Sequence, residues 1–271
     1  MPFRSRILSV AAATIALGFV AAACGDSAPE SDSSDHSGQY TAGDLSLDAR
    51  PEHIVSLSAT ATEMLYAIDA GDQVTAVDIT SNYPESVPAT DLDAFTPNVE
   101  AIAGYEPDLV VVSHDQDDII AKLGEVKLPV YFAPAAVTLD DTYQQINDLG
   151  ALTGHPDEAE TLSSQMDADI NDATGRLPDE GEPLTAYYEL DAGLFSLTSD
   201  TFAGSLLERA GLSNIADEAD DAAETGGYPQ LSAEFVVDAD PDVIFVSTGG
   251  EDAAAELAKR DGWDTITAVK N

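Results

Sequence analysis

Short apolar runs, separated by glycine and proline, fill the chain from Arg50 onward. Strands are predicted for HIVSLS (53–58) and QVTAVD (73–78), because each is a short run rich in β-branched residues. Between them, TATEMLYAIDAG has apolar residues at helical spacing and ends at Gly71, which is typical of a helix stop. The pattern therefore predicts a β-α-β unit at the start of a folded region.

The same order of elements occurs twice. NVEAIAGYEPDLVVVS (98–113) predicts a short helix, a Pro-Asp corner and a strand, and LSAEFVVDADPDVIFVS (231–247) predicts the same three. Glu100 lies seven residues before Pro107, and Glu234 lies seven before Pro241. Wholly apolar strands belong to sheets that are covered on both faces. We therefore expect two α/β lobes, over residues 50–136 and 178–271.

Residues 137–177 separate the two lobes and carry apolar residues at helical spacing. Pro156 suits the first turn of a helix. A helix from Pro156 to Leu177 would be roughly 33 Å long at ~1.5 Å per residue. The sequence thus predicts a long helix that joins the lobes.

The N-terminus predicts export. Arg4 and Arg6 precede an uncharged run from Ile7 to Ala23, which is followed by the single cysteine of the chain, Cys24. This arrangement resembles bacterial lipoprotein signals, in which the cysteine is lipidated and becomes the first mature residue. It implies a signal peptide over 1–23 and an exported protein held on the cell membrane by a lipid, facing the outside or the periplasm. Residues 24–49, rich in Ser, Asp and Gly, predict a flexible acidic tether.

The large negative net charge of the chain disfavours two classes of binding partner. With 51 acidic and 10 basic residues, the formal net charge is −41. Such a field repels nucleic-acid phosphates and anionic membrane surfaces, so neither is an expected partner of the folded part. A strongly solvated surface, suited to a salt-rich habitat, explains the acidity; a cation-binding role is the alternative.

The folded part resembles the bacterial ABC-importer substrate-binding proteins for cobalamin, ferric siderophores and haem. The likeness runs from Arg50 to Asn271 and is carried by SLSATATEMLYAIDAG, NVEAIAGYEPDLVVVS, YYEL, TFAGSLLERAG and YPQLSAEFVVDADPDVIFVS. It implies the class III periplasmic binding protein fold, with two α/β sandwich lobes, a long interlobe helix and a ligand cleft. The partners implied are a permease dimer with its ATPase, and the protein is expected to be a monomer. Because relatives continue past the motif GWDTITAVKN with a further strand and helix, an incomplete C-terminal lobe is expected.

The resemblance assigns a role to the repeated glutamates. Relatives dock on the permease through one acidic residue in each lobe, and Glu100 and Glu234 match those positions. From the residues alone, Asn98 and Ser232 are good helix N-caps, so each glutamate falls in a first helical turn, where the helix dipole favours a carboxylate. That structural reading stays open beside the docking role.

Ligand contacts are expected in loops after the strands, because open α/β sheets bind ligands at the carboxyl ends of their strands. Aromatic rings there suit a large flat chelate. In the resemblance, cobalamin binders have an aromatic residue where this chain has Ser113, which favours a ferric siderophore. The negative field favours a neutral or cationic hydroxamate-type complex. Cobalamin and haem remain alternatives, and no further cofactor is expected. The predicted ligand residues are Ser58, Thr60, Tyr83, Phe95, Ser113, His114, Tyr188 and Tyr228.

The sequence disfavours two other functions. An enzyme is not expected, because the chain lacks a G-x-S-x-G elbow, an H-E-x-x-H helix and a G-x-x-x-x-G-K-[ST] loop. A direct receptor for zinc or manganese would need several His and carboxylate ligands. Only His53, His114 and His155 lie in the predicted folded part, and they are widely spaced in the sequence. No resident metal site is therefore predicted.

Overall fold

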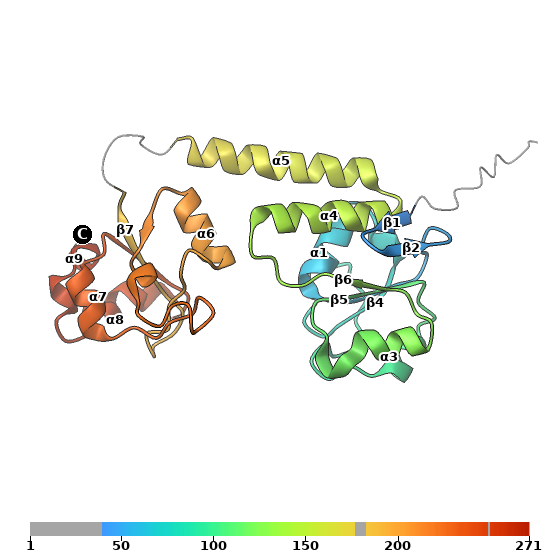
Figure 1. Ribbon diagram of the computed structural model, residues 1–271, viewed down its shortest axis with the longest axis horizontal. Coiled ribbons are helices and arrows are strands. Elements are labelled where there is room, and N and C mark those ends of the chain that lie inside the picture. Colours follow the sequence, from blue (N-terminus) through green and yellow to red (C-terminus); the bar gives the residue numbers. More distant parts are fainter. Residues whose placement is uncertain (1–39, 177–182, 249, 271) are drawn as a thin grey trace, which may run out of the picture. The chain divides into compact units, whose positions relative to one another are not determined.

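The computed structural model describes residues 40–176, 183–248 and 250–270 (Figure 1). The predicted signal peptide and Cys24 lie outside these residues, as do residues 24–39 of the predicted tether. None of the helices in the described ranges has the length and apolar character needed to cross a bilayer.

A parallel four-stranded sheet forms the centre of the first lobe. Its strands, in spatial order, are β4 (Val74–Val77), β3 (Ile54–Leu57), β5 (Leu109–Val112) and β6 (Val130–Phe132). All four residues of β3 and of β5 are buried. The prediction that these apolar runs form a sheet covered on both faces is confirmed for this lobe.

Helices cover both faces of this sheet, as Figure 1 shows. Alternate residues of β5 point to opposite sides: Leu109 and Val111 join one core cluster, and Val110 and Val112 join the other. The helices are α1 (Ala59–Ala67) and α4 (Leu139–Thr153) on the first side, and α2 (Val99–Ala103) and α3 (Ile119–Glu125) on the second.

The tether prediction is wrong for residues 40–47. Strands β1 (Tyr40–Ala42) and β2 (Leu45–Leu47) pair as an antiparallel hairpin. Ala42 and Leu47 are buried in the core cluster that includes residues of α4. This stretch is polar on average, but it has a few apolar side chains at alternate positions. Burial of these side chains holds the hairpin against the first lobe.

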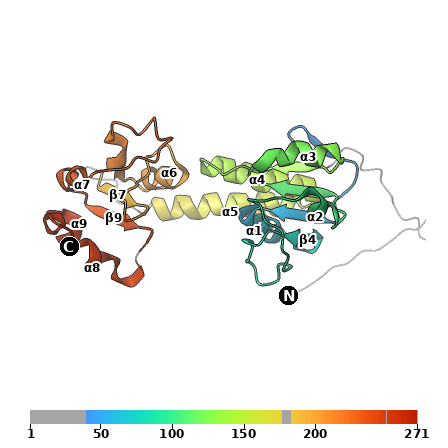
Figure 2. The same cartoon turned by 90° about the horizontal axis from the view of Figure 1, so that it is seen from below.

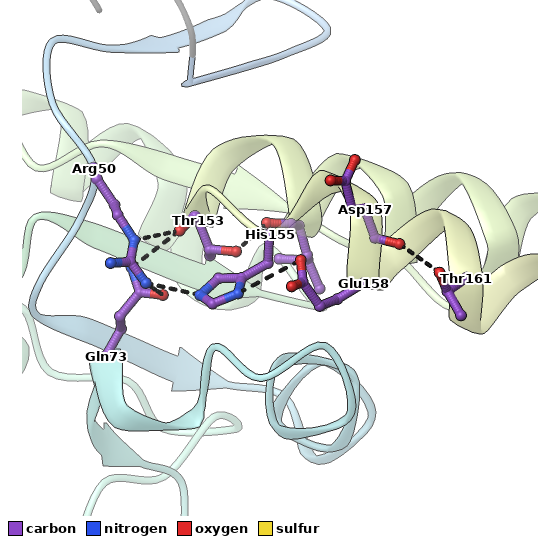
Figure 3. A network of polar contacts seen from close by, with 8 residues as sticks. Arg50, Gln73, Thr153, His155, Asp157, Glu158 and Thr161 are labelled. Atoms are coloured by element: carbon purple, nitrogen blue, oxygen red, sulfur yellow. Dashed lines mark hydrogen bonds and ion pairs between the residues drawn. The ribbon is translucent and has the colours of Figure 1, made fainter. Parts of the chain in front are cut away.

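A polar network fixes the chain where it leaves the hairpin (Figure 3). The Nε of Arg50 donates to the carbonyl of Thr153 at 2.8 Å, and its Nη2 donates to Gln73 Oε1 at 3.3 Å. The same nitrogen lies 2.7 Å from Nε2 of His155, whose Nδ1 is 3.9 Å from Glu158. One guanidinium thus ties the start of the lobe to the corner between α4 and α5.

Helix α4 belongs to the first lobe, which corrects the prediction that residues 137–177 all lie between the lobes. Its buried residues Ile146, Leu149 and Leu152 are part of the first-lobe core. The connecting helix is α5 (Pro156–Thr174), which lies beside α4 in Figures 1 and 2. At ~1.5 Å per residue it is roughly 28 Å long. The predicted end of this helix, Leu177, lies outside the described residues.

The second lobe repeats the plan of the first. Strand β7 (Thr185–Glu189) pairs in parallel with β8 (Ser213–Asn214) and β9 (Val243–Val246). The largest fully buried side chain in its core is Trp263, with Tyr187 next to it. The helices of this lobe are α6 (Phe202–Arg209), α7 (Ala233–Ala239), α8 (Ala253–Leu257) and α9 (Thr267–Lys270). Short 3₁₀ turns span Gly71–Gln73, Gln116–Asp118, Ile215–Glu218, Gly250–Asp252 and Trp263–Thr265.

Strand β9 differs from its counterpart β5, although both are wholly apolar. All of β5 is buried, whereas Val243, Ile244 and Val246 are only half-buried and Phe245 is 36% exposed. Within the described residues β9 pairs with β7 alone, whereas β5 pairs with strands on both sides. The prediction of complete burial is therefore wrong for this strand.

Equivalent hydrogen bonds confirm the internal repeat. The carboxylate of Asp108 accepts from the backbone nitrogens of Glu52 and His53 at the start of β3, at 2.9 and 3.1 Å. In the second lobe, the carboxylate of Asp242 accepts from the backbone nitrogen of Thr185 at the start of β7, at 2.9 Å. Each Pro-Asp corner therefore fastens the third strand of its lobe to the first.

A buried ion pair stands at the end of β7. Glu189 is 1% exposed, and both its carboxylate oxygens accept from the guanidinium of Arg260, at 2.5 and 2.7 Å. The guanidinium carbon lies 4.4 Å from the ring centroid of Trp263, which adds a cation–π contact. This pair links β7 to the segment that follows α8.

Candidate ligand-binding site

A pocket of about 540 Å³ opens where the four strands of the first sheet end. The first residue after each strand lines it: Ser58 follows β3, Asp78 follows β4, Ser113 follows β5, and Ala133 follows β6. The carboxyl ends of parallel strands meet at one edge of a sheet, so their loops converge there. The pocket volume lies in the range typical of small-molecule sites.

The lining combines apolar side chains with hydroxyl and amide groups. Its further residues are Leu57, Ala59, Thr60, Met64, Thr80, Ala94, Phe95, His114, Pro134, Ala135, Ala136, Thr142, Gln145, Phe202 and Tyr228. Such a surface offers contact area to a large ligand and a few groups that orient it.

Ser58 has a structural role in addition to its place in the pocket. Its backbone is extended, and its side-chain oxygen accepts from the nitrogen of Ala61 at 3.2 Å, so it is the N-cap of α1. Thr60, in the first turn of the same helix, is exposed and faces the pocket. Of the two hydroxyls, that of Thr60 is therefore the freer to contact a ligand.

Phe95 is held in the pocket wall by a short turn. The carboxylate of Asp93 accepts from the backbone nitrogen of Phe95 at 2.8 Å and from the Thr96 hydroxyl at 2.9 Å. These hydrogen bonds, the Phe95 one above all, lower the pKa of Asp93 below its usual value. The ring of Phe95 is 60% exposed and its centroid lies 5.8 Å from that of His114. An exposed aromatic ring on a stiffened loop suits contact with a flat ligand.

His114 is exposed, and its Nδ1 lies 2.9 Å from the hydroxyl of Ser113. This contact engages Nδ1 of the ring. The neighbouring carboxylate of Asp115 instead accepts from the backbone nitrogen of Ile120 at 3.0 Å, near the start of α3. Ser113, His114 and Asp115 therefore do not form the nucleophile–base–orienter chain that a hydrolase needs.

Among the described residues, Asp78 is the one carboxylate in the lining, and it is 2% exposed. Its Oδ1 accepts from the hydroxyl of Ser81 and its Oδ2 from that of Thr80, each at 2.5 Å. Behind it, the buried hydroxyl of Thr62 bonds to those of Ser56 and Ser81 at 2.9 and 3.1 Å. A buried polar cluster thus underlies this side of the pocket.

Helix α4 contributes Thr142 and Gln145 to the pocket lining. Thr138 and Asp141 form a capping box at its start, and hydrogen bonds from Thr138 and Val137 lower the pKa of Asp141. Further along, the amide nitrogen of Gln145 donates to the carbonyl of Pro134 at 2.7 Å. This bond holds the loop after β6, which carries Ala133 to Ala136, against the helix.

The structure brings six of the eight predicted ligand residues to this pocket: Ser58, Thr60, Phe95, Ser113, His114 and Tyr228. Tyr83 is 63% exposed but is not part of the lining. Tyr188 is also absent from it, and its ring stacks on that of Phe245, the residue opposite it on β9, with centroids 6.0 Å apart and an interplanar angle of 17°. Tyr83 and Tyr188 therefore lie outside the lining of this pocket, and their role as ligand contacts stays a prediction.

Sequence reasoning missed the residues after β4 and β6, together with Gln145 and Phe202. The signal for Asp78 was present, since it directly follows the predicted strand QVTAVD. The loop APAA after β6 carries no polar side chain, so nothing in its chemistry marked it.

The pocket carries charge of one sign, negative. Its lining contains Asp78 and, among the described residues, neither lysine nor arginine. No cluster of three or more His, Cys, Asp or Glu side chains that could hold a metal ion occurs in the described ranges. The described lining offers apolar, hydroxyl and amide contact surface.

The two predicted docking residues occupy equivalent places. Asn98 caps α2 by accepting from the nitrogen of Ala101, and Ser232 caps α7 by accepting from that of Phe235. Glu100 and Glu234 each stand second in these helices, and both are exposed. They are thus available to a partner, one on each lobe.

Comparison with known proteins agrees with this geometry. A family model described as periplasmic binding protein matches residues 54–271. An uncharacterised ABC transporter substrate-binding lipoprotein of Bacillus subtilis is 29% identical over 238 residues, which are 84% of this chain and 73% of that protein. A cobalamin-binding protein of Halobacterium salinarum is 29% identical over 213 residues, 76% of this chain and 57% of that one.

Solved structures show the same fold. A possible iron-binding, periplasmic solute-binding protein of Staphylococcus epidermidis superposes with a TM-score of 0.72 at 24% identity, covering 82% of this chain and 88% of that one. The periplasmic vitamin B12-binding protein of Vibrio cholerae gives 0.64 at 26% identity, covering 82% and 85%. The predicted class III periplasmic binding protein fold is confirmed.

Proposed function

Because this chain belongs to the periplasmic binding protein family, we propose that it is the substrate-binding component of an ABC importer for a metal chelate. The observation that carries the proposal is the pocket at the carboxyl ends of β3, β4, β5 and β6, lined by apolar, hydroxyl and amide groups. Relatives named for substrate binding and for cobalamin binding support the same class of function.

Within that class we propose a ferric siderophore as the ligand, with cobalamin and haem as the alternatives. Ser113 stands in the pocket wall where a larger aromatic side chain would offer a corrin ring more contact area. The polar groups of the same lining, including Thr60, Thr142 and Gln145, suit the oxygen-rich rim of a ferric chelate.

Equilibrium titration of the purified protein with a ferric trihydroxamate, a ferric catecholate, cobalamin and haem tests the ligand class. We expect micromolar or tighter binding of the trihydroxamate, recorded by quenching of intrinsic fluorescence. Phe95→Ala should weaken it about tenfold, or ~1.4 kcal/mol. The matched control is Tyr83→Ala, which removes an equally exposed ring of the β4–α2 loop that is not in the lining. Selective binding of cobalamin or haem alone would contradict the siderophore assignment.

Tyr228 is the second aromatic position to test. It is 49% exposed and lines the pocket, so Tyr228→Ala should also weaken the trihydroxamate about tenfold, ~1.4 kcal/mol. An unchanged affinity would remove Tyr228 from the site.

We further propose that Glu100 and Glu234 dock the protein on its permease. Exposed charges contribute little binding free energy, but they steer and orient association. The double variant Glu100→Lys with Glu234→Lys should fail to bind permease-containing vesicles while it keeps its ligand affinity. Loss of ligand affinity in this variant would place the glutamates in the ligand site instead.

The membrane anchor proposed at Cys24 has its own test. Cys24→Ser should release the protein from the membrane fraction and leave ligand binding intact. If the variant stays in the membrane fraction to the same extent as the wild type, the anchor assignment is wrong.

The periplasmic binding protein family is a family of transport proteins rather than a class of enzymes. We therefore expect the chelate to be recovered chemically unchanged after release, which mass spectrometry of the released ligand can verify. Titration with free Zn²⁺ or Mn²⁺ against the chelated metal separates this function from direct metal capture.

A further inference from the structure

Building on the proposed function, we propose that the carboxylate of Asp78 sets the charge of the ligand: the pocket selects chelates with a cationic group and disfavours those with a net negative charge. Asp78 is 2% exposed, directly follows β4 and lines the pocket. Within the part of the chain that the structure describes, its carboxylate lines the pocket without an ion-pair partner.

The immediate partners of Asp78 are neutral. Its carboxylate accepts from the hydroxyls of Thr80 and Ser81 and, at 3.4 Å, from the backbone nitrogen of Thr80. A carboxylate has about four acceptor positions, so three donors leave room for one more. The hydroxyls of Ser56 and Thr62, packed behind Ser81, are also uncharged.

No cation of the described part of the chain pairs with Asp78. The described arginines have other partners: Arg260 pairs with Glu189, Arg209 with Asp167, and Arg176 with Asp172, while Arg50 lies in the network of Figure 3. A buried charge without a counter-ion is unfavourable, and a cation brought by the ligand would offset that cost. An anionic chelate would instead meet a like charge in a partly desolvated pocket.

Asp78 also shapes the start of the β4–α2 loop through its bonds to Thr80 and Ser81. A purely structural role predicts that its replacement weakens every ligand to the same degree. A charge-selecting role predicts that replacement changes the ratio of affinities between ligands that differ only in charge. This ratio separates the two roles.

The experiment uses one linear ferric trihydroxamate with a pendant amine in three forms: the free ammonium (cationic), the acetylated amine (neutral) and the succinylated amine (anionic). The metal coordination is the same in all three. In the wild type we expect the cationic form to bind at least tenfold more tightly than the anionic form. Measurement at ~1 M salt, where the Debye length is ~3 Å, screens the general field of the acidic protein and leaves contact interactions.

Asp78→Asn should bring the cation-to-anion affinity ratio close to one, since the amide keeps much of the hydrogen bonding without the charge. The control is Asp44→Asn, an exposed residue of the β1–β2 hairpin outside the lining, which changes the net charge equally and should leave the ratio unaltered. Thr60→Lys, which adds a cation at an exposed lining position, should shift the preference toward the anionic form.

Circular dichroism decides first whether Asp78→Asn is folded; if it is not, the wild-type ratio and the Thr60→Lys shift decide the matter. Equal affinities in the wild type, a preference for the anionic form, or an unchanged ratio in folded Asp78→Asn would overturn the role of Asp78. Tight binding of anionic haem with no binding of the three trihydroxamates would also overturn it while leaving the importer function standing. Binding of no chelate at all would instead refute the proposed function.

Discussion

Removing Arg260 should destabilise the second lobe strongly, because it would leave Glu189 buried without its counter-charge. The guanidinium makes two hydrogen bonds to this carboxylate, at 2.5 and 2.7 Å, and Glu189 is 1% exposed. In the described ranges, the carboxylate also accepts from the hydroxyl of Tyr187, at 3.4 Å. We therefore test Arg260→Met, which keeps an unbranched apolar stem against Trp263 and removes the charge.

The expected cost follows from the burial of the pair. Breaking a buried ion pair by removing one partner typically costs ~3–5 kcal/mol. The side chain of Arg260 is 28% exposed, so water can reach part of the gap and the lower end, ~3 kcal/mol, is expected. With a urea m-value of ~1–3 kcal/mol per molar, the midpoint of unfolding should fall by roughly 1–3 M.

The assay uses the single tryptophan of the chain, Trp263, which is 1% exposed in this lobe. Its emission in urea reports unfolding of the second lobe. Glu189→Gln combined with Arg260→Met should be less costly than Arg260→Met alone, because no charge then remains buried. A loss below ~1 kcal/mol for Arg260→Met, or simple additivity of the two changes, would refute the reasoning.

Two further predictions concern the remaining polar groups of the two cores. Burial, with a smaller effect of Glu189, raises the pKa of the Tyr187 hydroxyl above its usual value. A tyrosine in an unfolded chain has a pKa of ~10, so the stability that this group contributes is complete below that pH and is lost as the pH rises above it. Tyr187→Phe should therefore reduce the loss of urea stability at alkaline pH, measured by the emission of Trp263. An equally steep loss in the variant would contradict the raised pKa. In the first lobe, Arg50→Ala should lower stability by ~1.5–3 kcal/mol, since a charged donor to the Thr153 carbonyl is lost. This loss is measured by urea unfolding, with far-ultraviolet circular dichroism as the signal. The control is Arg176→Ala, which removes an exposed ion pair and should cost ~1 kcal/mol or less. Equal losses for the two variants would contradict the role of the network in Figure 3.

The sequence predicted those features that arise from local pattern. The twin motifs around Glu100 and Glu234 form equivalent helices and strands, since N-caps, Pro-Asp corners and apolar runs act within a few residues. The predicted helix stop at Gly71 was less accurate. Helix α1 ends at Ala67, and Asp69, with φ of 61°, makes the left-handed turn there.

The sequence did not predict the features that depend on tertiary contacts. Tyr188 lies in β7 and Phe95 in the β4–α2 loop, and both are aromatic, but Tyr188 stacks on Phe245 across β7 and β9 while Phe95 faces the pocket. Side-chain direction in a strand depends on register, which the apolar run alone does not reveal. The hairpin of Tyr40 to Leu47 depends on burial against α4, a contact distant in sequence.

Ligand-dependent uptake through the cognate permease tests the central claim most directly. The permease and its ATPase are reconstituted in liposomes, the purified protein is added with a ⁵⁵Fe-labelled trihydroxamate, and accumulated label is measured with and without ATP. We predict ATP-dependent uptake that requires the protein, falls with Phe95→Ala through weaker loading, and is abolished by Glu100→Lys with Glu234→Lys despite normal loading. Uptake that proceeds equally without the protein, or a loaded protein that transfers no chelate, would contradict the account.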